Sequence, residues 1–419
     1  MAGNIKRLAG RRCSVWPYRI CGRWLRVCWD LPGRAVANGV ADMQEDFEKA
    51  NDLRAMNSDF RIAGCTDRDG QRQSLEERKS TRTICSKSVP GKEFRMNNDV
   101  AQIICCPRCR SQLGRKESHE RQLFCCNSEC KYSREGFLEV FDQPVLVDFD
   151  KSILSEDAFL HRGGQSYRSR DDSRSSVKTR VLQLFFGTNY VARACCAKFL
   201  RQLKEDNKRP RILVIGGGEQ GSGVDELYND ISIDLVGTDI YASSNTTIVA
   251  DGHQLPFIDA SFDGVWIQAV LEHVLDPPIV VAEIYRVLRP GGLVFADTPF
   301  MQQVHENAYD FTRYTLSGHR WLFRNFAMLD AGATSGGAGT AFRWSVQYLI
   351  RSITGSNKLG KAVSLLFFWT RFLDRAGKRR PNADAASGVY FLGSKAIAPI
   401  CPHDMISFYE QQAMASSVG

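Results

Sequence analysis

The sequence predicts an α/β protein in which a doubly wound, largely parallel sheet follows a small cysteine-rich module. Three observations support this. Apolar runs alternate with helical segments after Pro210, six cysteines cluster between Cys105 and Cys130, and 419 residues are enough for several folding units. We expect a disordered leader over 1–98, the cysteine module over 99–150, a linker over 151–180, the α/β domain over 181–400 and a tail over 401–419.

The leader has no sustained hydrophobic period and is dense in Arg, Ser, Asp and Asn, a composition typical of disorder. Its first 40 residues hold eight Lys and Arg against one acid, so seven of the eight net positive charges lie there and one lies in the remaining 379 residues. The nearly neutral body does not favour a nucleic-acid partner. The start lacks the apolar core of a secretory signal; a transit peptide and an extension upstream of Met43 or Met96 both stay open.

The cysteine module contains two metal-binding patterns, Cys106-Pro-Arg-Cys109 and Cys125-Cys126-Asn-Ser-Glu-Cys130. Two such pairs satisfy tetrahedral Zn²⁺, and a site closed by four thiolates is typically structural. Cys106, Cys109 and Cys130 belong to either ligand set, while Cys125 and Cys126 compete for the fourth position. Paired cysteines in a long chain favour metal binding in a reducing compartment, which we expect to be the cytoplasm, over disulfides.

The module resembles the zinc ribbon of the Trm112-like family. The matching residues are Cys106-Pro-Arg-Cys109, Leu123-Phe-Cys125, Tyr132 and the strand Gln143-Pro-Val-Leu-Val147. The resemblance favours Cys125 over Cys126 as the ligand. Asp142 stands where the family has glycine, and the second cysteine pair is more widely spaced than usual.

The α/β domain begins with a helix that Asn189 caps and that runs to about Leu203. Short apolar runs then predict strands at 211–215, 233–238, 262–267, 292–296 and 387–393, with a helix at 277–288. Residues 341–380 read as an inserted helical segment that is basic and amphipathic. Such a segment is compatible with peripheral contact with a membrane surface, and a solvated helix end is the alternative.

A glycine-rich loop closes the first of these strands. Glycines there let a ligand approach the backbone closely, and Asp239, at the end of the second strand, can accept hydrogen bonds from both hydroxyls of a ribose. Asp251 sits where a carboxylate and neighbouring amides can bind an adenine amino edge. The predicted cofactor-binding residues are Gly216, Gly218, Gly221, Gly223, Asp239, Asp251 and Gly252.

This ordered set resembles class I S-adenosylmethionine-dependent methyltransferases of type 11 over about residues 180–395. The resemblance rests on the glycine loop, on Ala250-Asp-Gly-His-Gln-Leu-Pro-Phe257 and on Leu288-Arg-Pro-Gly-Gly292. It implies a Rossmann-like doubly wound sheet, S-adenosylmethionine as cofactor and methyl transfer as the reaction. Val214 replaces the acid usual in the first strand, so Glu219, Asp263 or backbone carbonyls would hold the methionine amino group. A dinucleotide-dependent hydride transfer explains neither of the two later motifs.

The segment from Thr298 to Thr315 follows the fourth predicted strand, where ligands bind in such sheets. It resembles a loop of methyltransferases encoded near bacterial surface-polysaccharide genes. On that resemblance His305 or Asp310 serves as catalytic base and Arg313 as a clamp for a substrate anion; the alternative is that Asp310 and Arg313 form a structural pair.

Two further expectations concern neighbouring side chains. His273 is a second substrate-site candidate, at the mouth of the cofactor site. Trp266 and Tyr309 either offer aromatic faces to a sulfonium or pack in the core.

The expected function is therefore methyl transfer to a small molecule or glycan, as in surface-polysaccharide metabolism. Two alternatives stay open. Ribosomal RNA guanine-N1 methyltransferases also carry an N-terminal zinc module, and Ser133-Arg-Glu-Gly-Phe137 is similar to one of their strands. The chain could also be a non-catalytic module that docks a partner through its zinc ribbon. The oligomeric state is left open.

Overall fold

The computed structural model describes residues 18–20, 23–25, 98–116, 119–164, 189–334, 336–376 and 379–414. The chain divides into two units, Met1–Thr83 and Ile84–Gly419. In the first unit, strands β1 (Tyr18–Ile20) and β2 (Arg23–Leu25) pair antiparallel. The rest of the predicted leader up to residue 97, residues 165–180 of the predicted linker and residues 415–419 of the tail lie outside the described residues.

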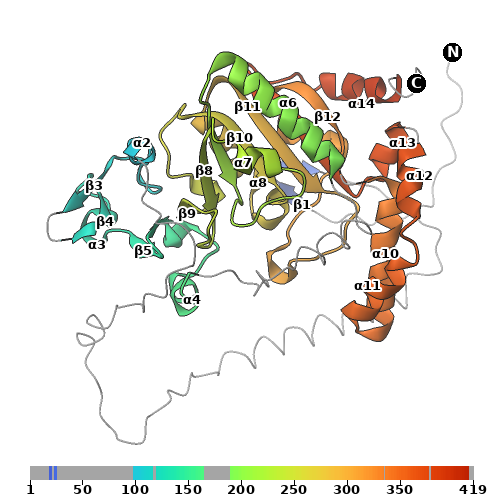
Figure 1. The fold of residues 1–419 in the computed structure, drawn as a ribbon, viewed down its shortest axis with the longest axis horizontal. Coiled ribbons are helices and arrows are strands. Elements are labelled where there is room, and N and C mark those ends of the chain that lie inside the picture. The colour runs from blue at the N-terminus through green and yellow to red at the C-terminus, as the bar shows by residue number, and fades with distance from the viewer. Residues whose placement is uncertain are drawn as a thin grey trace, which may run out of the picture. The chain divides into compact units, whose positions relative to one another are not determined.

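The second unit is built on a nine-stranded sheet with the order β12-β13-β11-β10-β7-β8-β9-β6-β5 (Figure 1). The strands from β6 through β11 in this order run parallel, whereas β13 is antiparallel to both β11 and β12, and β5 is antiparallel to β6. This confirms the predicted Rossmann-like, parallel-rich α/β fold. The strands are β5 (Leu138–Val140), β6 (Gln143–Leu146), β7 (Arg211–Ile215), β8 (Asp234–Asp239), β9 (Ile248–Ala250), β10 (Phe262–Gln268), β11 (Leu288–Pro299), β12 (Phe326–Ala333) and β13 (Gly388–Lys395).

The central strands read as continuous apolar runs because both faces of the sheet are covered. Alternate residues enter two different cores. Val265 and Ile267 of β10 point to one face, while Trp266 points to the other, where it packs between the rings of Phe199 and Phe295. Trp266 is 1% exposed, so it is a core residue and offers no face to a ligand.

Helices cover both faces. Helix α6 (Tyr190–Asp206) is capped by Asn189, whose side chain accepts a hydrogen bond from the Ala192 amide as predicted, and it packs on the Trp266 face with α7 (Asp225–Asn229). Helix α8 (Pro277–Val287) begins at a proline and lies on the opposite face. The remaining helices of this part are α9 (Leu316–Leu322) and α14 (Asp404–Met414), with short 3-10 turns η4 (Gly252–Gln254), η5 (Leu271–His273) and η6 (Asn307–Tyr309).

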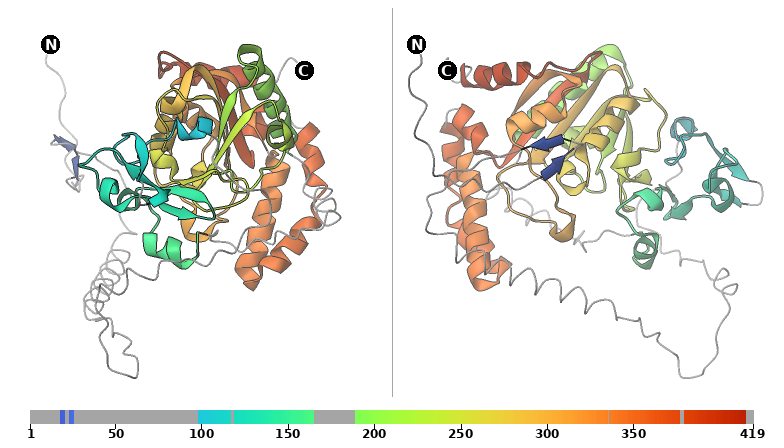
Figure 2. Two further views of the ribbon diagram at one scale, coloured as in Figure 1. Left: turned by 60° about the vertical axis from the view of Figure 1, so that its left-hand side comes forward. Right: turned by 180° about the vertical axis from the view of Figure 1, so that it is seen from behind.

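The cysteine module is continuous with the sheet. It comprises α2 (Asn98–Ala101), the antiparallel hairpin of β3 (Leu113–Lys116) and β4 (His119–Cys125), and α3 (Tyr132–Glu135) (Figure 2). Strand β6 then pairs with β9, about a hundred positions later in the chain, and Ile104 forms an antiparallel bridge with Phe257. The predicted boundary at residue 150 therefore divides a single sheet. The turn η3 (Phe149–Lys151) and helix α4 (Glu156–His161) follow.

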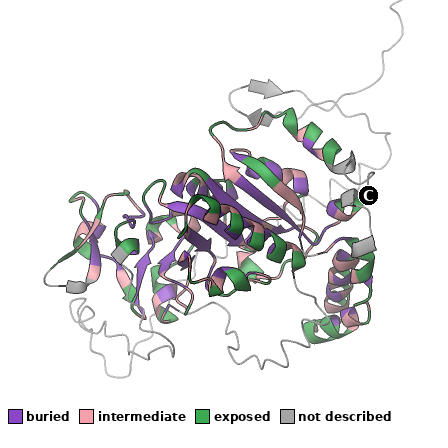
Figure 3. Cartoon of the chain, turned by 45° about the horizontal axis from the view of Figure 1, so that its top comes forward, coloured by how far each residue is buried: buried purple, intermediate pink, exposed green. Residues whose placement is uncertain are grey.

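The predicted insertion forms a stack of helices, α10 (Ala338–Thr354), α11 (Asn357–Leu365), α12 (Thr370–Ala376) and α13 (Arg379–Asp384). Figure 3 shows much of the surface of α10 and α11 as exposed, in contrast to the buried strands of the sheet. Among the described residues, no helix combines the length and the apolar composition needed to traverse a bilayer.

We predict that Trp266→Ala lowers the free energy of unfolding by about 3–5 kcal/mol, because it empties a large site between two aromatic rings. Trp369→Ala is the matched control: this tryptophan is 49% exposed, and its removal is expected to change stability by less than about 1 kcal/mol. Urea denaturation followed by circular dichroism measures both. Equal losses for the two variants would contradict the assignment of Trp266 to the core.

Candidate active site and metal centre

The glycine loop that follows β7 lies at the carboxyl edge of the sheet, where β7 separates β8 from β10. Gly216 has φ +73°, and a Cβ there would lie 2.1 Å from the Val270 side chain. The Gly217 amide donates to the Thr238 carbonyl at 2.9 Å, which holds the loop against β8. Successive strands are added on one side of β7 as β8 and β9, and then on its other side as β10 and β11. The order therefore switches between β7 and β10, the place where ligands bind in sheets of this kind.

Asp239 closes β8 beside this loop. It is 9% exposed, and its carboxylate accepts hydrogen bonds from the Gly218 amide at 2.8 Å and the Ile240 amide at 2.7 Å. A Cβ on Gly218 would lie 2.7 Å from the carboxylate, so only glycine fits this approach. The predicted pair of loop and acid is thus brought together by the fold.

Asp251 lies after β9, the next strand of the sheet. Its carboxylate accepts hydrogen bonds from the His253 amide at 2.9 Å, from His253 Nδ1 at 2.6 Å and from the Ser152 hydroxyl. Burial acts in the opposite direction, but these donors lower the pKa of Asp251 below its ordinary value. A carboxylate has about four acceptor positions. The three donors therefore leave one for a ligand amino group.

The other predicted glycines have different surroundings. A Cβ on Gly221 would meet the Gln268 side chain at 2.4 Å, and one on Gly223, which has φ +88°, would meet the Asn189 carbonyl at 2.6 Å. Gly252 begins the turn η4, close to the Val280 side chain. Gly223 thus allows close packing against the start of α6, whereas Gly221 lies against the Gln268 side chain at the end of β10.

Asp263 does not lie at this edge. It is the second residue of β10, at the amino end, where it accepts from the Arg211 amide at 2.6 Å and pairs with Arg289 at 2.8 Å. It cannot substitute for the missing acid at Val214. Glu219, the other candidate, is exposed on the loop.

A half-buried acid that sequence reasoning missed does lie at this edge. Asp297, near the carboxyl end of β11, accepts from Thr334 Oγ1 at 2.8 Å and Asn189 Nδ2 at 3.3 Å, and Gln268 Nε2 lies 3.5 Å away. Burial raises the pKa of Asp297 to about 6. The strand predicted at 292–296 stops one residue short of it, and extending that strand would have placed an acid at its end.

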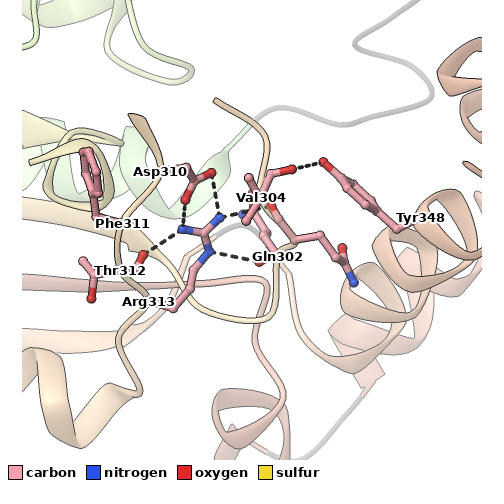
Figure 4. Close-up of a pocket in the computed structure, with 8 residues that line it drawn as sticks. Gln302, Val304, Asp310, Phe311, Thr312, Arg313 and Tyr348 are labelled. Atoms are coloured by element: carbon pink, nitrogen blue, oxygen red, sulfur yellow. Dashed lines mark hydrogen bonds and ion pairs between the residues drawn. The ribbon is translucent and has the colours of Figure 1, made fainter. Parts of the chain in front are cut away.

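The loop between β11 and α9 lines an open pocket of about 550 Å³ (Figure 4). Tyr348 of α10 closes one side and donates its hydroxyl hydrogen to the Val304 carbonyl. The lining residues are Gln302, Gln303, Val304, Asp310, Phe311, Thr312, Arg313 and Tyr348. The predicted substrate segment and the helical insertion therefore meet here.

Arg313 organises this loop and is not available as an anion clamp. Its Nε donates to the Gln302 carbonyl at 2.9 Å, and its two terminal nitrogens donate to Asp310 and to the carbonyls of Thr312 and Gln303. A guanidinium has five N–H donors, and these contacts use all five. The predicted role of Arg313 in binding a substrate anion is thus not supported.

Asp310 is the partner of Arg313, as the structural alternative proposed. It also accepts from the His305 amide at 2.7 Å. Burial opposes ionisation, but the Arg313 guanidinium holds the pKa of Asp310 at about 2. A carboxylate with that pKa is a weak base at neutral pH, so the geometry gives no support to Asp310 as the catalytic base.

His305 and His273 lie together beside the loop, with ring centroids 5.4 Å apart in an edge-to-face arrangement. His273 Nδ1 lies 2.7 Å from the Tyr309 carbonyl, and burial lowers the pKa of His273 below its ordinary value. Both imidazoles are half-buried. The two predicted histidines, one after β10 and one after β11, are thus brought to a single place, and Tyr309 is half-buried beside them.

The four cysteines of the module converge. The Sγ atoms of Cys106, Cys109, Cys125 and Cys130 all lie within 4.8 Å of one another. Cys106 and Cys130 are 3.8 Å apart at sulfur, and Cys109 and Cys125 are 3.4 Å apart. Zn–S bonds of about 2.3 Å in a tetrahedron place sulfurs about 3.8 Å apart, whereas a disulfide needs about 2.05 Å. The donor set therefore fits zinc, and Cys126 is exposed and outside this group.

The thiols differ in their acidity. Burial opposes ionisation of Cys109, but hydrogen bonds from Ser111 lower its pKa to about 6. Burial raises the pKa of Cys125 to about 11 and also raises that of Cys106. Four thiolates in this buried place would need the positive charge of a metal ion.

Residues 213–296 match the sequence model of a family described as "Methyltransferase domain". The match runs from β7 into β11 and includes Gly216, Asp239 and Asp251. It supports a methyltransferase.

Curated relatives carry similar names. The chain is 27% identical over 232 residues to an uncharacterized chloroplastic methyltransferase of Arabidopsis thaliana, covering 49% of this chain and 63% of the relative. It is 53% identical over 49 residues to the O-methyltransferase cnsE of Penicillium expansum, covering 12% of this chain and 18% of that protein. The chain thus spans less than two thirds of the length of these relatives.

Solved structures give weaker likenesses. Haemonchus contortus phosphoethanolamine N-methyltransferase 2 in complex with S-adenosyl-L-methionine is 16% identical with a TM-score of 0.34, covering 60% of this chain and 62% of that one. A methyltransferase of Methanosarcina mazei is 14% identical with a TM-score of 0.28, covering 46% and 95%. The fold assignment therefore rests on the strand order described above.

For the metal centre we predict one zinc ion per purified chain, lost in Cys125→Ser and retained in Cys126→Ser. These adjacent cysteines differ in whether the sulfur joins the cluster. Metal analysis after gel filtration measures both. The Cys125→Ser chain should also unfold at a lower temperature, since metal binding stabilises such modules. Zinc loss in Cys126→Ser with retention in Cys125→Ser would reverse the ligand assignment.

Proposed function

We propose that this protein transfers a methyl group from S-adenosylmethionine to a small-molecule or glycan acceptor. The proposal rests on the order in which a glycine loop and two aspartates follow neighbouring strands at one edge of the sheet. The Gly216–Gly218 loop follows β7, Asp239 closes β8 and Asp251 follows β9. Because these strands are neighbours, the three groups lie side by side along one edge of the sheet. The match of residues 213–296 to a methyltransferase domain supports the same reading.

Each group has a defined task toward that cofactor. The Asp239 carboxylate, already oriented by two amides, would accept from the ribose hydroxyls, and Asp251 would accept from the adenine amino group. The bare backbone at Gly216 would allow close approach of the methionine portion. The half-buried Asp297 is the acid on this edge suited to its ammonium group, because no acid stands at Val214. The cofactor supplies an already activated sulfonium methyl, so the chain has mainly to align the acceptor and exclude water.

The pocket beside Gln302 and Tyr348 is where we propose that the acceptor binds. It joins the loop after β11 to the helical insertion. Two half-buried histidines, His273 and His305, adjoin it, and His305 remains the candidate to take a proton from an acceptor hydroxyl. The four cysteines, which pack in the same core as the sheet, would hold a structural zinc ion that keeps the β3–β4 hairpin against it.

We predict that calorimetry detects S-adenosylmethionine binding to the full chain and that Asp239→Ala weakens it at least about 100-fold. Two hydrogen bonds to a charged group contribute about 1.5–3 kcal/mol each. Asp234→Ala is the control, since Asp234 begins the same strand at the opposite edge and pairs with Arg211. Absence of binding by a folded wild-type chain would remove the methyl-transfer proposal.

We further propose that the helical insertion contacts an anionic membrane surface. Between residues 338 and 376 the sequence has six Lys and Arg but one acid, Asp374, whose carboxylate is occupied by the amides of Gly339 and Thr340. Large apolar side chains of the same stack are exposed to between 45% and 72%, an unusual density for a surface in water. They are Phe342, Leu349, Ile353, Leu359, Leu366, Trp369, Phe372 and Leu373.

This surface adjoins the acceptor pocket, because Tyr348 of α10 donates to the Val304 carbonyl of the loop. Basic residues beside exposed apolar ones match the headgroup and upper acyl regions of a bilayer. A chain bound in this way would hold its pocket near an acceptor carried on a lipid.

We predict that the chain sediments with vesicles containing phosphatidylglycerol and not with vesicles of phosphatidylcholine alone, and that added salt weakens the binding. Ile353→Asp and Leu366→Asp should each reduce binding about tenfold, the worth of one apolar side chain. Ile397→Asp, on a fully exposed isoleucine outside the stack, is the control. Equal binding by all variants would exclude the stack as the contact surface.

A further inference from the structure

Glu272 is a buried carboxyl group whose bonding capacity is unused. It belongs to the turn η5, just beyond the carboxyl end of β10, and its exposure is 0%. Within the described part of the chain, neither of its carboxyl oxygens has a hydrogen-bond partner. Burying such a group unpaired costs about 1–3 kcal/mol or more. Burial also raises the pKa of Glu272 to about 8. A fold that retains this cost at its ligand-binding edge has a carboxyl group available for something that binds there.

Two imidazoles converge on the same carboxyl group. One ligand atom each from Glu272, His273 and His305 lies within 4.8 Å of the other two. His273 Nε2 is 3.6 Å from Glu272 Oε1, which is too long for a hydrogen bond between them. The three residues come from two segments, the turn after β10 and the loop after β11.

The hydrogen bonds of the two histidines prepare them as ligands. The Tyr309 carbonyl, 2.7 Å from His273 Nδ1, can only accept, so Nδ1 carries the hydrogen and Nε2 presents its lone pair. His305 Nδ1 lies 3.2 Å from the Gln303 carbonyl and 3.4 Å from both an Asp310 carboxylate oxygen and a terminal nitrogen of Arg313. The two oxygens accept and favour the same tautomer for His305, whereas the single Arg313 donor, at the longer distance, favours the other. Metal-binding histidines typically donate their second ring nitrogen to a carbonyl or carboxylate in this way.

We propose that Glu272, His273 and His305 bind a divalent first-row transition-metal ion at the edge of the acceptor pocket. Two imidazoles and one carboxylate suit such ions, and three protein ligands leave coordination positions open. Bonds of about 2.0–2.2 Å place ligand atoms roughly 3–3.5 Å apart, so small side-chain rotations close the present spacing. The Glu272 carboxyl loses its proton and gains a partner in one event.

The ion would be held where the acceptor binds, since His305 belongs to the loop that lines the pocket. With the ion bound, His305 is a metal ligand and does not act as the base; an acceptor oxygen could take an open position and release its proton to solvent more readily there. This role rests on the proposed methyl transfer, whereas the binding of the ion itself does not.

The test is a titration with Co²⁺ of the full-length chain that carries a single equivalent of zinc, in the absence of S-adenosylmethionine. Zinc at the four cysteines leaves Co²⁺ to occupy the new site, and visible spectroscopy distinguishes the two, since thiolate ligands alone give a sulfur-to-cobalt charge-transfer band. We expect one Co²⁺ per chain without that band. Glu272→Gln, which keeps the shape and removes the charge, and His273→Ala should each weaken binding at least tenfold.

His161→Ala is the control, because this histidine of α4 is exposed and far from the cluster in sequence; it should bind as the wild type does. Thermal unfolding of each variant establishes that it is folded, and Glu272→Gln should be no less stable than the wild type. If the wild type takes up no Co²⁺, or if Glu272→Gln binds it equally well, the site does not exist. Calorimetry with S-adenosylmethionine on the same samples tests methyl transfer separately, so either proposal can fail alone.

Discussion

The close approach of the Gly216–Gly218 backbone to Asp239 is the constraint on which the candidate site depends. Hydrogen bonds to a charged acceptor are worth about 1.5–3 kcal/mol each, and Asp239 accepts two, from the Gly218 and Ile240 amides. They fix the loop after β7 to the end of β8. A Cβ on Gly218 would fall 2.7 Å from the carboxylate, so any side chain there would separate the two. The spacing between the loop and Asp239 is therefore set by backbone atoms.

The strands that the sequence predicted are those buried on both faces. Their continuous apolar runs can be recognised in the sequence without knowing which strands pair with them. Strands β9 and β12 were missed for different reasons. β9 is three buried residues long, too short to show a period, and β12 has no β-branched residue and no alternation of apolar and polar residues, and only its first residue is buried. The boundary at residue 150 was misplaced because β6 pairs with β9 about a hundred positions away. The residues within each of the two strands do not indicate which strand it pairs with.

The cofactor residues were predictable because each directly follows a strand, and the carboxyl ends of parallel strands meet at one edge. The same rule separates Asp263 from Asp297. Asp263 is the second residue of β10 and so lies at the amino edge, whereas Asp297 lies near the carboxyl end of β11. Strand position alone could have excluded one and found the other. The sequence offered the structural pair of Arg313 with Asp310 as an alternative but could not decide for it, because the five donors of Arg313 are used by carbonyls and a carboxylate that only the folded loop brings together.

The acids of this edge differ in how their charge is offset. Asp310 has the guanidinium of Arg313, and its pKa falls to about 2. Glu272 is buried and Asp297 half-buried, with no Lys or Arg bonded to either among the described residues, and loss of solvation raises their pKa values to about 8 and about 6. An arriving positive charge lowers the pKa of a nearby carboxyl group, and each unit of that shift is worth about 1.4 kcal/mol of binding. A cationic ligand is therefore bound more tightly by the ionised form of each carboxyl group. This applies both to the ammonium group of the proposed cofactor at Asp297 and to a metal ion at Glu272.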